Sequence, residues 1–163
     1  MRSFSQAADE INRHIIAKYK GDALERLVAA ILEAQGYTVY QSPKGADKGV
    51  DLLAAPGPLG FGEPCICVQV KSQQDPVDRP TLDQLIGTMS NVGAQRGLLV
   101  SWSGFKSSVH KEEAQQFFRV RLWDSSDLLE HLFTHYDTLD DDLKAEIPLK
   151  RIWTLAMADG GED

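Results

Sequence analysis

The chain has little of what marks several common protein classes. Two cysteines in 163 residues are too few for a disulfide-built scaffold. Cys65 and Cys67 lie on one face of a predicted strand, about 6.6 Å apart along it, which is poor geometry for a disulfide. No run approaches the roughly 18 apolar residues of a membrane helix, and charged residues between Asp9 and Lys18 interrupt the early apolar runs, unlike a signal peptide. We therefore expect a reduced, cytoplasmic protein without a membrane segment.

The chain also lacks the excess of positive charge that is typical of nucleic-acid-binding proteins. Its net charge is −7, and the acidic residues concentrate near the C-terminus. The segment 124–146 holds eight acidic residues and one lysine, whereas residues 1–123 hold 14 basic and 13 acidic residues. Because phosphate contacts dominate DNA affinity, we expect a polyanion to approach the first part and the chain alone to bind DNA weakly.

Size and periodicity predict one globular α/β domain, since 42% of the residues are hydrophobic and 25% are charged. Apolar residues recur at helical spacing in some segments and alternate in others. The predicted helices are 3–19, 22–35, 79–94, 107–119, 125–136 and 140–147. The predicted strands are 37–42, 50–55, 65–71, 97–102 and 120–124. The segment 43–49 is a predicted Gly-rich turn.

Side-chain pattern adds expectations within the second half of the chain. In the helix 107–119, the candidate inner positions are Val109, Ala114, Phe117 and Phe118. Ser125 or Ser126 is expected to cap the following helix, and the tryptophans, Trp153 among them, are expected in the core.

The order of the elements predicts a mixed sheet flanked by helices. Three early strands joined by turns can form an antiparallel meander, and the later alternation of strands with helices favours parallel crossovers.

A cluster of polar residues is predicted at one end of this sheet. In the strand "CICVQVK", Gln69 and Lys71 share a face with the cysteines, and the strand of Asp51 should pair with it. Glu25, in the first turn of its helix, can reach the sheet edge. Mg²⁺ prefers oxygen ligands such as two carboxylates, to which the Gln69 amide and the Val70 carbonyl can add. Lys71 would neutralise phosphate charge and orient or deprotonate a water.

Purely structural explanations exist for three of these residues. Lys71 can be a strand-end lysine that extends to water, and Asp51 can close a turn after Gly49. Glu25 can be a solvent-facing helix acid paired with Arg26.

The ordered set of motifs resembles the PD-(D/E)XK nucleases and, more narrowly, the Mrr-like restriction endonuclease catalytic domain. The resemblance covers roughly residues 20–135 and rests on "ALERLVAAILEAQGY" (23–37), "GADKGVD" (45–51), "QVK" (69–71), "GLLVSWSGF" (97–105) and "RLWD" (121–124). It implies a restriction-endonuclease-like αβββαβ core. The implied division is an N-terminal helix or linker (1–20), the nuclease domain (21–136) and an acidic extension with a disordered end (137–163).

The resemblance implies a metal-dependent DNA endonuclease of the type IV, Mrr-like restriction type, with Mg²⁺ as cofactor and Mn²⁺ as a substitute. Carried over by position, Glu25 is the helix-borne acid, Asp51 the principal metal ligand, Gln69 the middle motif residue and Lys71 the catalytic lysine. The alternatives are a structure-specific nuclease such as a Holliday-junction resolvase, and a non-cleaving DNA- or protein-binding module of the same fold.

DNA is the expected partner. Nothing in the chain looks like a DNA-recognition domain, so the chain is either the catalytic part of a longer protein or recruits DNA through a partner. Cutting both DNA strands at once needs two active sites, and a homodimer would supply them.

One residue departs from the wider superfamily, which has an acid where this chain has Gln69. Mrr-like members often have Gln there. One negative charge is nevertheless missing, and two unit charges about 4 Å apart interact by roughly 4 kcal/mol at an effective dielectric of 20. We therefore expect weaker metal binding than in an all-acid site.

Overall fold

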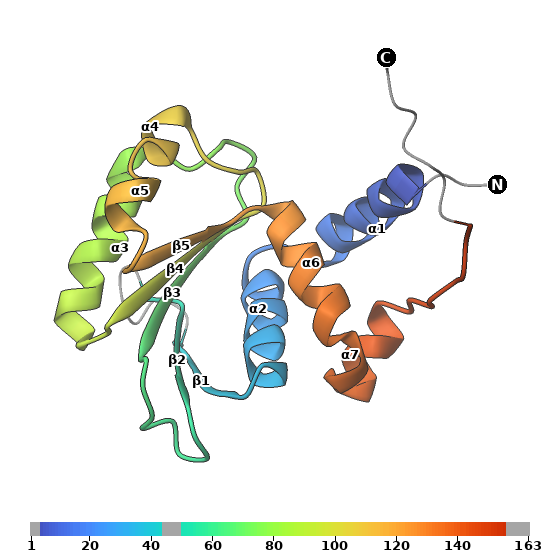
Figure 1. The fold of residues 1–163 in the computed structure, drawn as a ribbon, viewed down its shortest axis with the longest axis horizontal. Coiled ribbons are helices and arrows are strands. Elements are labelled where there is room, and N and C mark those ends of the chain that lie inside the picture. The colour runs from blue at the N-terminus through green and yellow to red at the C-terminus, as the bar shows by residue number, and fades with distance from the viewer. Residues whose placement is uncertain (1–3, 44–49, 156–163) are drawn as a thin grey trace.

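A five-stranded mixed sheet forms the centre of the molecule (Figure 1). The computed structural model describes residues 4–43 and 50–155. The predicted turn at 43–49 lies outside the described residues except for Pro43, and so does the C-terminal end expected to be disordered. The strands are β1 (Tyr37–Gln41), β2 (Leu52–Pro56), β3 (Ile66–Lys71), β4 (Arg96–Ser101) and β5 (Val120–Trp123).

The strands lie in the order β1-β2-β3-β4-β5. The pairs β1–β2 and β2–β3 are antiparallel, whereas β3–β4 and β4–β5 are parallel. This confirms the predicted meander followed by crossovers, and with it the mixed α/β class. In the β2–β3 ladder, Leu53 pairs with Cys67 and Leu52 with Val68.

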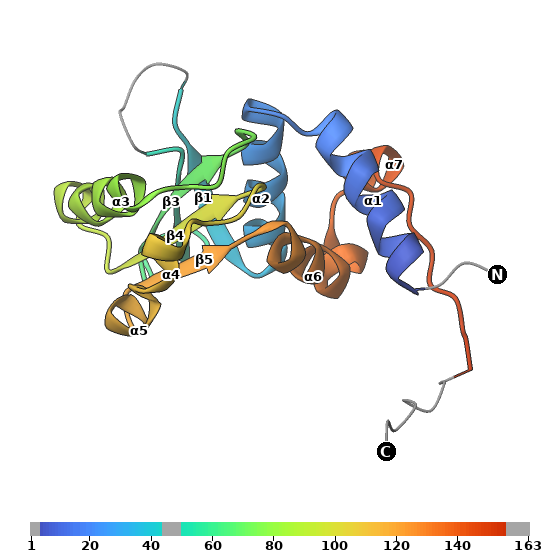
Figure 2. The ribbon, with the colours of Figure 1, turned by 90° about the horizontal axis from the view of Figure 1, so that it is seen from above.

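Helices cover both faces of the sheet (Figure 2). One face packs against α2 (Asp22–Ala34) and α6 (Ser125–His135), and α1 (Phe4–Lys18) and α7 (Asp141–Glu146) pack in the same core on the side of these helices away from the sheet. The other face packs against α3 (Arg79–Val92) and α4 (Ser107–His110), and α5 (Glu113–Gln116) follows α4 on the same side. A 3₁₀ turn, η1 (Tyr136–Thr138), joins α6 to α7.

The alternation along β3 sorts its side chains between two hydrophobic cores. Val68 and Val70 belong to the core under α2 and α6, whereas Cys67 belongs to the core under α3. Because alternate strand residues face opposite sides, Gln69 and Lys71 lie on the α3 face with Cys67. Within the described residues, no helix combines the length and apolar character needed to cross a membrane.

The expected helix 107–119 is wrong as a single element. The structure has two short helices, α4 and α5, with a turn between them. Val109 is buried as expected, but Ala114, Phe117 and Phe118 are exposed. Two short helices with a break do not keep one continuous inner face, so the helical spacing no longer points these side chains at the sheet.

The cap expected from Ser125 or Ser126 is also wrong. Asp124 is the N-cap of α6, and its carboxylate accepts a hydrogen bond from Asp127 N at 3.0 Å. The Asp127 carboxylate in turn accepts from Asp124 N at 3.0 Å. This reciprocal pair is a capping box, and it satisfies two backbone donors where a serine hydroxyl would satisfy one.

The candidate active site

Asp51 lies at the point where the β2–β3 ladder ends. The strand was expected to begin at residue 50, but β2 begins at Leu52 and Asp51 precedes it in a bend. Asp51 N still donates to Val68 O at 3.1 Å. One step past the Leu52–Val68 pair, the register places Asp51 opposite Gln69, so their side chains are cross-strand neighbours on one face.

The Asp51 carboxylate accepts the hydrogen bond that Val70 N would otherwise donate to a backbone carbonyl of β2. Its Oδ2 accepts a hydrogen bond from Val70 N at 2.6 Å. Because the N–H and C=O of one strand residue point to the same neighbouring strand, the Val70 carbonyl faces the side of Asp51 as well. The role of this carbonyl as a metal ligand stays a prediction.

Glu25 reaches the same end of the sheet from α2. Its half-buried carboxyl lies beside Asp51 and accepts a hydrogen bond from Gln41 Nε2 at 3.5 Å. Burial raises the pKa of Glu25, and the negative charge of Asp51 raises it further. Two carboxyl groups held this close repel each other when both are ionised.

Gln69 is 3% exposed, and its Oε1 has no hydrogen-bond partner. An unpaired buried polar atom costs about 1–3 kcal/mol. The Oε1 atom therefore marks a place where a polar ligand or cation would be stabilising.

Lys71 ends β3 and is half-buried on the same face as Gln69. Among the described residues, its ammonium makes no hydrogen bond or ion pair with Asp51 or Glu25. The structure thus brings Glu25, Asp51 and Val70 into one group. Gln69 lies opposite Asp51 on the neighbouring strand. The Lys71 ammonium is not paired with either carboxylate.

Three further residues support the group. Gln41 ends β1 and contacts Glu25, and Ser72 Oγ accepts a hydrogen bond from Gly21 N at 3.0 Å, which ties the start of α2 to the end of β3. Cys67 is fully buried near Asp51, and burial together with that negative charge raises the pKa of its thiol to about 11. Cys67 is therefore a buried, neutral thiol at physiological pH, which makes it a poor nucleophile.

The donor set fits a hard divalent cation. Within the described residues, no group of three or more His, Cys, Asp or Glu side chains could hold a metal. Glu25 and Asp51 supply two carboxylates, so the unpartnered Gln69 Oε1 and the Val70 carbonyl would have to supply further oxygens. Mg²⁺ is often bound by one or two carboxylates with waters and substrate phosphate completing the shell, and the repulsion between the two carboxylates would be relieved by a cation.

The site lies inside the region matched by a known family. The model of the Mrr_cat restriction endonuclease family matches residues 16–132. The chain belongs to this family. No curated protein matches it.

This Mrr_cat chain also resembles solved restriction enzymes in fold. The DNA modification-dependent restriction endonuclease AspBHI has a TM-score of 0.65 and 15% identity, covering 91% of this chain and 42% of that one. The MspJI restriction endonuclease, solved in complex with a 27-mer oligonucleotide, has a TM-score of 0.59 and 16% identity, covering 91% and 37%.

A third solved structure is the ATP-dependent type ISP restriction-modification enzyme LlaBIII bound to DNA. Its TM-score is 0.50 with 21% identity, and the match covers 78% of this chain and 8% of that one. The Mrr_cat chain therefore has the restriction endonuclease fold and spans less than half the length of each of these enzymes.

Proposed function

We propose that this Mrr_cat chain is the catalytic domain of a Mg²⁺-dependent DNA endonuclease that hydrolyses phosphodiester bonds in a restriction system. The observation that carries the proposal is the pair of neighbouring carboxyl groups, Glu25 and Asp51, at the end of the sheet where the buried Gln69 Oε1 on β3 lacks a hydrogen-bond partner. Family membership and the fold shared with restriction enzymes support the assignment.

Each residue has a role that follows from its chemistry. Asp51 and Glu25, with Gln69 Oε1 and the Val70 carbonyl, would hold Mg²⁺ or Mn²⁺. When bound, such an ion supplies charge stabilisation at the scissile phosphate and lowers the pKa of bound water. The Lys71 ammonium, with three N–H donors and no acceptor, would face a phosphate oxygen and orient the attacking water.

The reaction is a hydrolysis. A bond forms between the water oxygen and phosphorus, and one bridging P–O bond breaks. One proton of the water is lost from the attacking side, and a proton is gained by the departing sugar oxygen. Fixing the water against the phosphate contributes through orientation, which here depends on Asp51 just before β2 and on Lys71 at the end of β3.

DNA recognition is proposed to reside largely outside this chain. AspBHI is described as DNA modification-dependent, and MspJI was solved with an oligonucleotide, but the matched part is 42% and 37% of those chains. By analogy, modified DNA is the substrate to test first.

The test is plasmid nicking by the purified chain on methylated and unmethylated DNA, with EDTA, Mg²⁺ or Mn²⁺. Nicking is expected only with a divalent ion, and Lys71→Ala and Asp51→Asn should abolish it. Asn at 51 keeps an oxygen that can accept from Val70 N, so the fold should survive. Lys111→Ala, at an exposed lysine after α4, is the matched control and should cleave normally.

Other outcomes would overturn the proposal. Cleavage in EDTA, or unchanged cleavage by Lys71→Ala, would contradict the assigned roles. Preference for four-way junctions over plasmid would indicate a structure-specific nuclease. Absence of cleavage on every substrate, together with no calorimetric Mg²⁺ binding, would indicate a non-cleaving module.

A further inference from the structure

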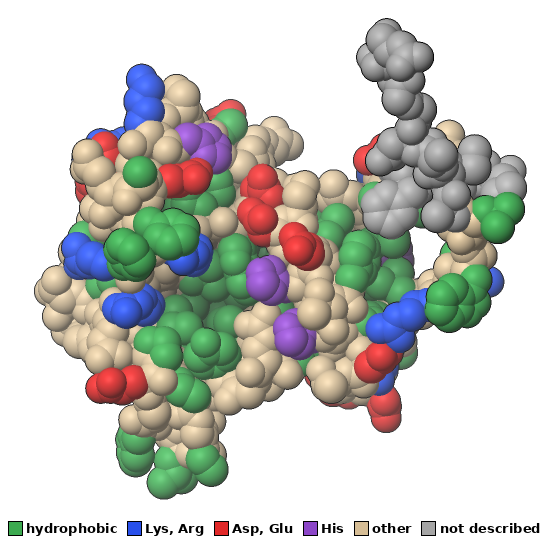
Figure 3. Space-filling view, viewed as in Figure 1, with side chains coloured by type: hydrophobic (Ala, Val, Ile, Leu, Met, Phe, Trp, Pro, Cys, Tyr) green, Lys and Arg blue, Asp and Glu red, His purple; other side chains and the backbone are tan. Residues whose placement is uncertain are grey.

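A groove beside β5 lies apart from the candidate active site, and nothing in the proposed mechanism uses it. We call it the β5 groove. It has a volume of about 340 Å³ and an apolar floor that includes Leu98 and Val120. Its lining also includes Arg96, Phe117, Phe118, Arg119, Arg121 and Trp123, which we call the rim, and, towards α2, β1 and β3, the residues Leu32, Gln35, Tyr37 and Ile66. Figure 3 shows hydrophobic side chains gathered in the hollow at the middle of this face, with Lys and Arg side chains on one side of it and Asp and Glu side chains above it.

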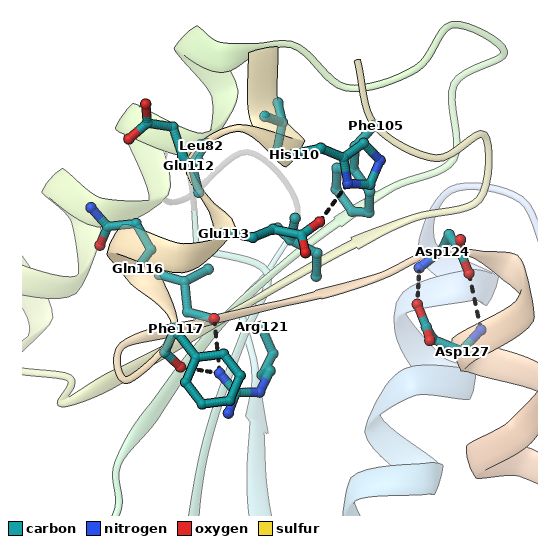
Figure 4. Close-up of a pocket in the computed structure, with 13 residues that line it drawn as sticks. Leu82, Phe105, His110, Glu112, Glu113, Gln116, Phe117, Arg121, Asp124 and Asp127 are labelled. Atoms are coloured by element: carbon teal, nitrogen blue, oxygen red, sulfur yellow. Dashed lines mark hydrogen bonds and ion pairs between the residues drawn. The ribbon is translucent and has the colours of Figure 1, made fainter. Parts of the chain in front are cut away.

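The aromatic rim is exposed and partly fixed in place. Phe117 is 52% and Phe118 80% exposed, and their rings meet edge to face with centroids 5.3 Å apart. The Arg121 guanidinium lies 4.0 Å from the Phe117 ring centroid and donates to the Phe117 carbonyl oxygen (Figure 4). Large apolar side chains held in the open beside a groove are typical of a binding surface.

Charge and backbone restrict what can bind there. The groove is lined by three arginines and, among the described residues, by no carboxylate. β5 is also an edge strand of the sheet, paired with β4 on one side. An open strand edge binds extended peptides by adding a strand. The surface therefore suits an extended segment that has apolar side chains and negative charge.

The C-terminal segment of this same chain has that character. Residues 150–155 form neither helix nor strand, and Ile152, Trp153 and Leu155 are 72%, 103% and 90% exposed. Trp153 is thus fully solvated, contrary to the expectation that it lies in the core. The sequence continues through Met157 to three acidic residues, Asp159, Glu162 and Asp163. An apolar stretch followed by acids matches an apolar groove with an arginine rim.

The segment starts far from its own β5 groove. Leu149 N donates to Tyr136 Oη at 2.9 Å, and Arg151 forms an ion pair with Asp137 at 2.9 Å. Both contacts attach it to η1. From there residues 152–155 extend away from the sheet. Helix α6 lies between this segment and the helices α3, α4 and α5 (Figures 1 and 2).

We propose that residues 152–157 of one copy add to β5 of a second copy and fill its β5 groove, and that the exchange is reciprocal. Reaching its own groove would require the segment to turn back across α6, whereas a second copy can present its groove directly. A two-fold arrangement would cover both sets of exposed apolar residues at once. It would also pair the acids after Met157 with the arginines of the rim.

The first test is the molecular mass in solution, by size-exclusion chromatography with light scattering over a range of concentrations. The full chain should reach twice its 18.0 kDa mass at high concentration. A variant lacking residues 150–163 and the variant Phe118→Asp should stay monomeric with unchanged far-UV circular dichroism. The matched control is Phe61→Asp, at a residue 85% exposed in the β2–β3 connection, and it should dimerise normally.

A second measurement follows the Trp153 emission, obtained as the difference between the full chain and Trp153→Phe. It should shift to the blue as the dimer forms, and the dimer should weaken in high salt because exposed ion pairs are screened. A full chain that stays monomeric at every concentration, or a dimer that survives the truncation, would overturn the proposal. A blue-shifted Trp153 in a monomer would show that the segment binds its own chain instead. Because none of these measurements uses cleavage or a metal, their result is independent of the proposed nuclease activity.

Discussion

Replacing Glu25 by Gln should stabilise the metal-free protein at neutral pH, although it removes a proposed metal ligand. Burial and the charge of Asp51 raise the pKa of Glu25 in the folded state. An acid whose pKa is raised in the folded state does not lower the free energy of unfolding below its unfolded pKa of about 4.3, because it is protonated in both states there. The cost grows between the unfolded and the folded pKa and is complete above the latter, so glutamine removes it at pH 7.

The size of the effect follows from the charge pair. Two unit charges about 4 Å apart interact by roughly 4 kcal/mol at an effective dielectric of 20. Since the Glu25 carboxyl is only half-buried, solvent screens much of this, and about 1 kcal/mol is a reasonable remainder. For a chain of this size, that corresponds to a rise in Tm of about 2–4 °C.

The assay is thermal unfolding in EDTA between pH 4 and 8, repeated with Mg²⁺. The gain should disappear at the acid end of the range. With Mg²⁺ the order should reverse, since a ligand at 100 times its Kd stabilises the folded state by about 2.7 kcal/mol and the variant binds it less well. Glu33→Gln, at an exposed acid on the same helix, is the matched control and should change neither series.

One result would refute this reasoning. If Glu25→Gln lowers the Tm in EDTA at pH 7, the Glu25 carboxylate is not repelled by Asp51, and the pair does not form the anionic half of a cation site.

Four more predictions concern single residues. Gln69→Glu should tighten Mg²⁺ binding measured by calorimetry, and an unchanged affinity would show that position 69 does not face the ion. Asp51→Leu should lower the free energy of unfolding by about 1–3 kcal/mol, because it leaves Val70 N without an acceptor, whereas Asp51→Asn should cost less; equal losses would contradict this. Gly21→Ala should destabilise by about 1–3 kcal/mol, since φ is 57° and ψ is −124° there; a neutral result would argue against strain. The Cys67 thiol should react with a disulfide reagent at pH 8 only after unfolding, because its pKa is about 11 and it is fully buried; rapid labelling of the native chain would contradict its placement.

The sequence was sufficient for most of the sheet because alternation is a strong signal. Alternation along 65–71 predicted that the cysteines, Gln69 and Lys71 share one face, and the structure places Cys67 in one core and Val68 and Val70 in the other, as alternation requires. Pairing of the Asp51 segment with β3 followed from their separation by one loop, and the register confirms it.

The wrong predictions arise where the spacing of residue types along the chain is overruled by a helix break or by hydrogen bonds that this spacing does not reveal. Phe117 and Phe118 fit the inner face of one long helix, but the helix breaks after His110 and both rings are exposed. Ser125 and Ser126 are good caps, yet Asp124 and Asp127 stand three residues apart and satisfy two donors reciprocally. In the first case the break in the helix removed the inner face that the spacing predicted. In the second case the reciprocal hydrogen bonds of Asp124 and Asp127 made Asp124 the cap instead of a serine.

The approach of Glu25 to Asp51 follows the expectation from the sequence, whereas the catalytic roles of these acids and of Lys71 stay predictions, and the contacts around the pair had weaker signals. Gln41 could have been inferred from the β1–β2 register, which pairs it with Leu52, next to Asp51. The hydrogen bond from Gly21 N to Ser72 Oγ joins segments 51 residues apart and has no signal in local pattern.

The antiparallel pairing of β2 with β3 places the connection between these strands at the opposite end of the hairpin from the candidate active site. Asp51 stands before the first residue of β2 and Lys71 is the last residue of β3, so both lie at one end of the hairpin, and the connection 57–65 lies at the other. A longer or shorter connection would leave the carboxylates and the lysine in place. This turn is therefore the natural position for an inserted label or tether, whereas an equal insertion directly after Lys71 would displace Ser72 and with it the start of α2.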